Sequence, residues 1–274
     1  MAILEVQVQG PIAWIILNRP DKLNALNDRL ISELVNALTR VAHDESIKVL
    51  VLSGSGRAFS AGFDLADDSE SDQADSEKWH QILARDVELT MTLWSFPKPT
   101  VAAVRGWCLA GGFELALACD MIVATEAARF GEPEIRYGSG PTTLLLPFVI
   151  GQKKTNEMLF TGESVSASEA QRIGIINRVV PEEALEQATR ELANQIALAP
   201  LTVLRLTKLA VNRTYEAMGL RQAVHSNLDL SAILNSANVP ERERFLELAR
   251  TKGLRHALAW RDSRYSGTAN PIPS

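Results

Sequence analysis

The amino-acid sequence predicts an α/β protein whose last third is entirely helical. Short β-rich runs alternate with helical patterns as far as about residue 180, and beyond Pro181 every patterned stretch is helical. One run, residues 48–53, is largely apolar, which is typical of a strand in a sheet covered on both faces. With 274 residues, 46% of them hydrophobic, the chain can bury a large core as one domain or as a domain with an appendage.

The N-terminal elements are predicted from hydrophobic period and turn residues. Residues 4–8 and 12–17 are β-rich runs split by a Gln-Gly turn, which predicts a hairpin. Asn27 or Asp28 can cap the helix that follows. The apolar stripe of this helix consists of Leu30, Ile31, Leu34, Leu38 and Val41. A strand over 48–53 and a helix over 76–95, ended by Pro97, complete this part.

The later elements follow from the same signals. A short buried strand over 100–104 leads through a glycine-rich turn into an Ala- and Leu-rich helix over 110–118. A capping box formed by Ser166 and Glu169 begins another helix. The other predicted elements are strands over 121–124 and 175–180, an extended segment over 130–135, and helices over 139–150, 152–160 and 166–173. C-terminal helices cover 182–198 and 201–218 and continue in amphipathic stretches broken at Gly219, Pro240 and Gly253, before a disordered tail from residue 266.

Composition and charge argue against several classes of protein. Residues 201–274 carry 11 Lys/Arg and 6 Asp/Glu, a balance of +5, whereas the rest carries 17 and 27, a balance of −10. Nucleic-acid binding would need a denser basic stripe, so no nucleic-acid partner is predicted. No run approaches the roughly 18 apolar residues of a membrane span, and the N-terminus lacks the pattern of a signal peptide. Two cysteines without metal-ligand spacing predict no metal site and a cytoplasmic location.

The glycine-containing loop 54–65 follows a predicted strand and invites a nucleotide-binding interpretation. Its sequence is neither Gly-x-Gly-x-x-Gly nor a P-loop, and it lacks the Gly-x-Ser-x-Gly nucleophile elbow. Residues 64–77 then contain seven acids and no base, a solvated segment that would repel phosphates. A nucleotide-dependent fold is therefore only weakly supported.

Residues 105–135 carry the strongest chemical signal. The first turn of a helix leaves N–H groups without intrahelical partners, and Gly111 lies there with no Cβ to block a close approach. Glu114 follows one turn later on roughly the same face of an otherwise apolar helix. Such a carboxylate either complements the helix dipole or takes part in chemistry on a substrate that develops an oxyanion.

Four segments, in order, resemble the enoyl-CoA hydratase/isomerase (crotonase) superfamily over essentially the whole chain. They are LNRPDKLNAL at 17–26, GRAFSAGFDL at 56–65, RGWCLAGGFELALACD at 105–120 and RFGEPEI at 129–135, with a further typical stretch at 161–174. The resemblance implies a spiral of ββα units followed by a helical region used in trimer formation. The expected division is a core with the acyl-CoA site over 1–199, a helical C-terminal region over 200–265 and a disordered tail over 266–274.

The resemblance also implies a reaction, the hydration of 2-enoyl-CoA thioesters. The matching positions make the backbone N–H groups of Phe63 and Gly111 an oxyanion hole for the thioester carbonyl. Glu114 would orient and deprotonate the water that attacks Cβ, and Glu134, protonated, would supply the Cα proton. Because family isomerases and several hydrolases keep one or neither glutamate, the pair favours a hydratase.

Substrate binding is expected from the first two segments. The implied residues are Lys22, Leu23, Ala61, Gly62, Asp64 and Leu65. Coenzyme A enters as part of the substrate, no separate cofactor is implied, and the expected assembly is a homotrimer or a dimer of trimers. Two roles stay open for the basic C-terminal helices, with Arg255, Arg261 and Arg264: they approach the nucleotide phosphates of a neighbouring subunit, or they form a solvated surface.

The chain departs from the family pattern after Glu134. Residues 136–147 are shorter and poorer in glycine than in typical hydratases, so this wall of the pocket is expected to be reshaped. Arg136 is expected to point outward, Glu132 to lie on the surface, and Ala110 to be a mild replacement for a usual glycine. Isomerase, thioester hydrolase and decarboxylase activities therefore stay open, as does a non-catalytic acyl-CoA-binding or scaffold protein.

Overall fold

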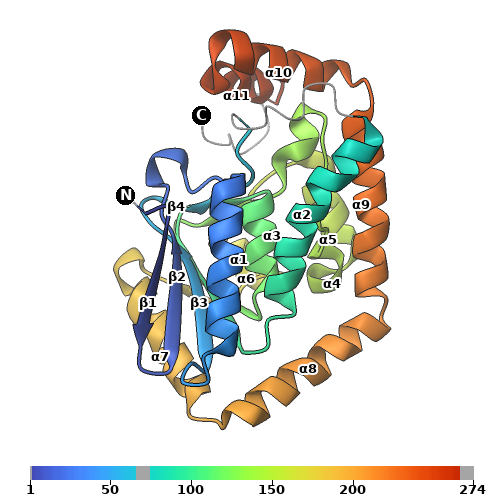
Figure 1. Cartoon of the computed structure of the whole chain (residues 1–274). Coiled ribbons are helices and arrows are strands. Elements are labelled where there is room, and N and C mark those ends of the chain that lie inside the picture. The colour runs from blue at the N-terminus through green and yellow to red at the C-terminus, as the bar shows by residue number, and fades with distance from the viewer. Residues whose placement is uncertain (1, 66–74, 266–274) are drawn as a thin grey trace.

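The computed structural model describes residues 2–65 and 75–265. The predicted disordered tail and most of the acidic segment 64–77 lie outside these residues. Figure 1 shows a twisted sheet beside a layer of helices, with further helices above and below. None of the helices in the described ranges is long and apolar enough to cross a membrane.

The larger sheet has six strands in the order β1-β2-β3-β5-β7-β10. Strands β1 (Leu4–Gln9) and β2 (Ile12–Leu17) form the predicted hairpin, with Leu4 opposite Leu17. The other neighbours pair in parallel. Their bounds are β3 (Val49–Gly54), β5 (Thr100–Val104), β7 (Met121–Thr125) and β10 (Arg178–Val180).

A smaller sheet of four strands was not predicted. Strands β4, β6 and β8 each follow a parallel strand of the larger sheet after a short turn, and β9 pairs antiparallel with β8. The strands are β4 (Ala58–Ser60), β6 (Trp107–Leu109), β8 (Arg129–Gly131) and β9 (Val165–Ser166). Segments of two or three residues are too short for a period-2 pattern, which explains why the sequence did not indicate them.

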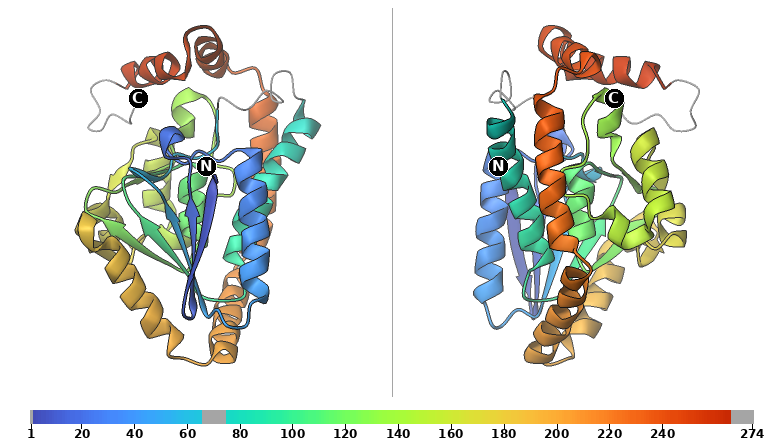
Figure 2. Two further views of the ribbon diagram at one scale, coloured as in Figure 1. Left: turned by 60° about the vertical axis from the view of Figure 1, so that its left-hand side comes forward. Right: turned by 90° about the vertical axis from the view of Figure 1, so that its right-hand side faces the viewer.

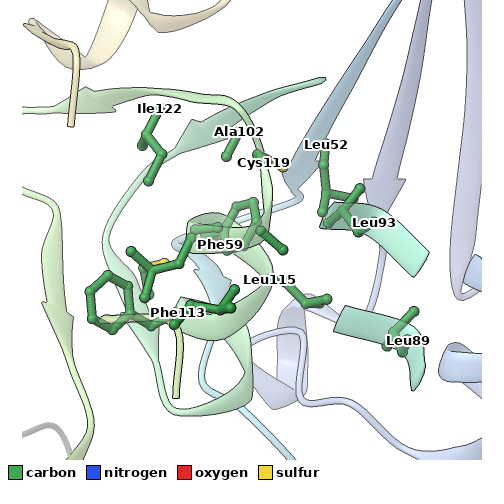
Figure 3. Packing of buried hydrophobic residues seen from close by; sticks show 14 of the residues in the cluster. Leu52, Phe59, Leu89, Leu93, Ala102, Phe113, Leu115, Cys119 and Ile122 are labelled. Carbon is green, nitrogen blue, oxygen red and sulfur yellow. The ribbon is translucent and has the colours of Figure 1, made fainter. Parts of the chain in front are cut away.

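Helices cover both faces of the larger sheet, as the apolar run 48–53 predicts. Helices α1 (Asp28–His43), α2 (Ser76–Trp94) and α3 (Gly111–Ala118) lie on one face, and α7 (Leu185–Ala197) lies on the other. Leu50 and Leu52 pack with the buried hydrophobic residues of α1, α2 and α3, whereas Val49 and Val51 pack with those of α7. Figure 3 shows Phe113 and Leu115 of α3 in the same core as Leu52 of β3. Because every residue of α3 is buried, this helix is a fixed internal support.

Four helices form the C-terminal third: α8 (Leu201–Ala217), α9 (Leu220–Ser236), α10 (Pro240–Lys252) and α11 (Leu254–Ser263). They break at Gly219, Pro240 and Gly253 as predicted. Helix α9 packs along α2, while α10 and α11 pack together at the opposite end from α8 and contact η2. The short elements are η1 (Pro20–Lys22), η2 (Pro133–Tyr137), α4 (Leu146–Ile150), α5 (Gln152–Thr161), α6 (Ala167–Arg172) and η3 (Glu182–Ala184).

The helix predicted over 139–150 is wrong in its first half. Only α4 (Leu146–Ile150) is helical, and Leu144 has a left-handed φ of +52°. The backbone groups of this loop bond to two side chains instead of to one another as in a helix. The Thr143 N–H donates to Glu114 at 2.6 Å, and the Asn227 amide donates to the carbonyl of Thr142 at 2.8 Å. Buried backbone groups need partners, and here α3 and α9 supply them.

Candidate active site

One side of the site is a loop that runs beside the segment at Leu26. Leu26 N–H donates to the Gly62 carbonyl at 2.8 Å, and Asp64 N–H donates to the Leu26 carbonyl at 2.9 Å. Successive N–H groups of an extended segment point to opposite sides, so the Phe63 N–H points away from Leu26. Among the hydrogen bonds of the described residues, none uses the Phe63 N–H as donor.

The start of α3 lies against this loop. Gly111 is the first residue of the helix, so its N–H has no intrahelical acceptor, and it donates to no other described residue. A Cβ placed on Gly62, whose φ is +95°, would lie 2.5 Å from the Cβ of Ala110 and 3.2 Å from the Gly111 nitrogen. A Cβ placed on Gly111 would overlap the Phe63 ring. The unpaired amides of Phe63 and Gly111 can therefore come close, because Gly62 and Gly111 have no Cβ that would clash here.

Ala110 holds this turn in an unusual backbone conformation. Its φ of +54° and ψ of −135° lie in a region that side-chain-bearing residues rarely adopt, and it has no side-chain cap to support it. The expectation of a mild change is therefore wrong in energetic terms, since an alanine in such a region costs of order 1–3 kcal/mol. The strained residue directly precedes the unpaired Gly111 amide.

Glu114 is buried in the first turn of α3, with an exposed fraction of 1%. Its Oε1 accepts the Thr143 N–H at 2.6 Å, and its Oε2 accepts the Thr143 hydroxyl at 3.0 Å. Burial raises the pKa of Glu114, and the donors of the Thr143 backbone and side chain partly offset that rise. The family resemblance gave no indication of Thr143, because only the tertiary structure brings residue 143 to residue 114.

Glu134 lies in η2 and is 7% exposed. Burial and then the charge of Glu114 raise the pKa of Glu134 to about 8, while Arg261 acts in the opposite direction. At neutral pH this carboxyl group therefore holds a proton for much of the time. Glu114 has several donors to stabilise its ionised form, whereas the Oε2 of Glu134 has no donor among the described residues.

A cavity of about 1020 Å³ has Phe63 and Glu134 in its wall. The predicted substrate-binding residues Lys22, Leu23, Ala61, Asp64 and Leu65 line it as well. Ala110 and Thr142 also line the cavity, whereas Gly62, Gly111 and Glu114 do not. Asp64 is paired with Arg19 at 2.9 Å, so its carboxylate is held in place at the mouth.

Two expectations about charged neighbours of Glu134 are wrong. Glu132 is not on the surface, because it is 3% exposed. Arg136 does not point outward, because it is 1% exposed and its Nε donates to the Thr161 carbonyl at 2.9 Å. The extended backbone that the prediction assumed is a 3₁₀ turn in the structure, in which residues three apart share a side. Glu134 and Tyr137 therefore lie on one side and Arg136 on another.

The basic C-terminal residues divide into two environments. Arg255 lines the cavity, and Arg264 forms an exposed ion pair with Glu241 at 3.3 Å. Arg261 also lines the cavity but is only 3% exposed, and its Nε donates to Asp262 at 2.8 Å. It is buried close to Glu134, where its charge lowers the pKa of that carboxyl group. Sequence analysis named Arg261 for a phosphate contact or a solvated surface, and it did not anticipate the effect of Arg261 on Glu134.

The site can polarise a carbonyl group and move protons at adjacent atoms. Two unpaired amides can bind a developing oxyanion, and two buried carboxyl groups in different hydrogen-bonding environments can act as base and acid. In the described part of the chain, no group of His, Cys, Asp and Glu is arranged to hold a metal ion. Both cysteines are free and buried, as expected of small hydrophobic residues.

Comparisons with known proteins show the family to which the chain belongs. The model of the family described as enoyl-CoA hydratase/isomerase matches residues 7–248. A probable mitochondrial enoyl-CoA hydratase of Dictyostelium discoideum is 39% identical over 212 residues, covering 76% of this chain and 74% of that protein. A probable enoyl-CoA hydratase of Rhizobium meliloti is 40% identical over 225 residues, covering 80% and 85%.

A solved structure matches this chain over its full length. The crystal structure of an enoyl-CoA hydratase/isomerase from Xanthobacter autotrophicus Py2 superposes with a TM-score of 0.93 at 39% identity, covering 100% of this chain and 99% of that one. The α/β core and helical C-terminal region are therefore those of a crotonase fold, and the protein is an enzyme. The chain belongs to the enoyl-CoA hydratase/isomerase family.

Proposed function

We propose that the protein hydrates 2-enoyl-CoA thioesters to 3-hydroxyacyl-CoA by syn addition of water. The observation that carries the proposal is the pair of buried glutamates beside two unpaired amides. Glu114 has its carboxylate oxygens hydrogen-bonded to Thr143, while Glu134 has a pKa of about 8. The relatives named as enoyl-CoA hydratases support the same reaction class.

The amides of Phe63 and Gly111 would bind the thioester oxygen. As the Cβ–O bond forms, electron density moves through Cα to that oxygen, and two fixed donors stabilise the developing charge. Losing one such donor typically costs roughly 3–4 kcal/mol. The bulk of Phe63 is tolerated because only its N–H contacts the substrate.

The two glutamates would divide the proton transfers. Glu114, ionised, takes a proton from water as the water oxygen bonds to Cβ. Glu134, protonated, forms the C–H bond at Cα and keeps the electron pair of its O–H bond as a carboxylate. The net addition is one water molecule, and the pair is reset when Glu114 releases its proton to solvent and Glu134 takes one up.

Coenzyme A would bind along the cavity mouth. Lys22 and Leu23 from the first motif and Ala61, Gly62, Asp64 and Leu65 from the second are the proposed contacts, and coenzyme A belongs to the substrate rather than being a separate cofactor. We also propose a homotrimer or a dimer of trimers. Helix α8 supports this assembly because it exposes Val203, Leu206 and Val211 by 53%, 60% and 51%.

The test is to incubate purified protein with crotonyl-CoA and with longer and aromatic enoyl-CoAs. Loss of the enoyl thioester absorbance with a mass gain of one water is expected for at least one substrate. Glu114→Gln should lower kcat by roughly 10²–10⁴-fold with little change in KM, as expected for loss of general acid–base catalysis. Glu183→Gln, an exposed glutamate on η3, is the control. Formation of a double-bond isomer, free coenzyme A or carbon dioxide instead of the hydroxy product would contradict hydration.

A further inference from the structure

A third buried carboxyl group lies next to the two glutamates of the proposed mechanism. Glu132 follows β8 and precedes η2, and only 3% of its surface is exposed. Its Oε2 is enclosed and has no hydrogen-bond donor among the described residues, and the same is true of the Oε2 of Glu134. Buried polar atoms in folded proteins are normally satisfied, so two neighbouring carboxyl oxygens without donors require an explanation.

A shared proton provides that explanation. Glu132 and Glu134 are both buried on either side of Pro133, and a hydrogen bond between their side chains affects the pKa of each. Two ionised carboxylates have only acceptors and cannot form such a bond, whereas a carboxylic acid has one O–H donor. One proton on either side chain therefore satisfies both groups and removes one of two like charges.

The surroundings place that proton on Glu132 when the pair holds only one. Burial raises the pKa of Glu132 well above its usual range, and the charges of Glu134 and Glu114 raise it further. The pKa of Glu134 rises to about 8, and its hydrogen bond with Glu132 acts against that rise. Glu132 is therefore the donor and Glu134 the acceptor of the bond.

The other titratable and charged groups facing the pair come from several elements. Glu114 of α3 acts on both glutamates, Cys108 of β6 faces Glu132, and Tyr137 of η2 faces both. Burial raises the pKa of the Cys108 thiol and of the Tyr137 hydroxyl, so both stay neutral. The facing cation is Arg261 of α11, whose own partner is Asp262 at 2.8 Å.

We propose that Glu132 is a positioning residue for Glu134: its O–H group holds the Glu134 carboxyl in place and stabilises the carboxylate left after proton delivery to Cα. In that step an O–H bond of Glu134 breaks, a C–H bond forms, and the electron pair stays on Glu134, facing the Glu132 donor. The inference rests on the proposed hydration. The inference gives a role to Glu132, to which the family resemblance assigns none.

Two substitutions separate a donor from a mere space-filling group. Glu132→Gln keeps an N–H donor for Glu134 and cannot ionise, whereas Glu132→Leu has no donor. Glu126→Gln, at an exposed glutamate after β7, is the matched control. The readouts are kcat, KM and the pH profile of kcat with crotonyl-CoA from pH 5 to 10, or with whichever enoyl-CoA wild type hydrates.

Glu132→Gln is expected to keep kcat within about threefold and to leave the alkaline limb of the profile in place. Glu132→Leu is expected to lower kcat by roughly 10–100-fold at unchanged KM, as for part of a general-acid contribution. Its alkaline limb should move up by about one pH unit, because loss of a donor to the ionised form raises the pKa of Glu134. A Leu variant with the wild-type rate and profile, or a Gln variant as impaired as the Leu variant, would overturn the proposal.

Infrared difference spectroscopy tests the proton on Glu132 without turnover and without the Leu variant, so the test does not depend on the folding of that variant. At pH 9, wild type minus Glu132→Gln should show the C=O stretch of a buried protonated carboxyl group, and Glu126→Gln should show none. Absence of that band means that Glu132 is ionised and ends the proposal. If wild type hydrates no enoyl-CoA while the band is present, the proposed function fails and the carboxyl pair itself stands.

Discussion

Replacement of Glu134 by glutamine should make the folded protein more stable at alkaline pH while it removes activity. The carboxyl group is 7% exposed, and its pKa is raised from an ordinary 4.5 to about 8. Between these values the folded state binds more protons than the unfolded state, so the free energy of unfolding falls as the pH rises through this window. Glutamine is nearly isosteric and cannot ionise, so it avoids that loss.

The size of the effect follows from the same values. The difference between 4.5 and about 8 corresponds to about 5 kcal/mol, at about 1.4 kcal/mol per pKa unit, if Glu134 alone carried it. Because Glu134 titrates as part of a coupled pair with Glu132, we expect a smaller gain, roughly 2–3 kcal/mol, for Glu134→Gln over wild type at pH 9. At pH 4.5 the two proteins should be nearly equal in stability, since Glu134 is then protonated in the folded state.

The assay is urea unfolding at pH 4.5, 7 and 9 at one protein concentration, because any assembly makes the transition depend on concentration. The same preparation should show hydration reduced by roughly 10²–10⁴-fold. Glu183→Gln, at an exposed position, should track wild type at every pH. If the stability difference between Glu134→Gln and wild type is the same at pH 4.5 and pH 9, the argument from burial is refuted.

Three further substitutions probe the backbone and the loop around the site. Gly111→Ala places a Cβ on the Phe63 ring, so kcat should fall by roughly 10²–10³-fold in the hydration assay as the amide pair separates, and an unchanged kcat would exclude these donors. Thr143→Val removes the 3.0 Å hydroxyl bond to Glu114 and should lower the free energy of unfolding at pH 7 by about 1.5–3 kcal/mol in urea titrations. Ala110→Gly relieves a φ of +54° and should raise the melting temperature by a few degrees, whereas a fall would show that the alanine is not strained.

Local sequence signals predicted much of the larger sheet and its covering helices. Asn27 caps α1 by accepting the Leu30 N–H at 3.0 Å, and Ser166 caps α6 by accepting the Glu169 N–H at 3.2 Å. These signals work because a cap or a hydrophobic stripe involves residues a few positions apart. The smaller sheet gave no comparable signal, because its strands of two or three residues are defined by pairing with distant segments.

The candidate site was predictable only where a motif matched a position. The resemblance pointed to Phe63, Gly111, Glu114 and Glu134, and the structure adds how burial and hydrogen bonds treat them differently. Thr143 could not be found from the sequence, because it reaches Glu114 across 29 positions through a non-helical loop. The loop is non-helical because α3 and α9 satisfy its backbone groups, which no local pattern reports.

The sequence by itself determined the order of the main elements, the breaks between them, and the family, because these depend on short-range spacing and on motifs of adjacent residues. Only the tertiary structure decided which carboxyl groups are buried away from solvent. Glu132 and Glu134 are two residues apart in the sequence, and the fold buries both, with exposed fractions of 3% and 7%. Desolvation depends on everything that surrounds a side chain, and distant parts of the chain supply those surroundings.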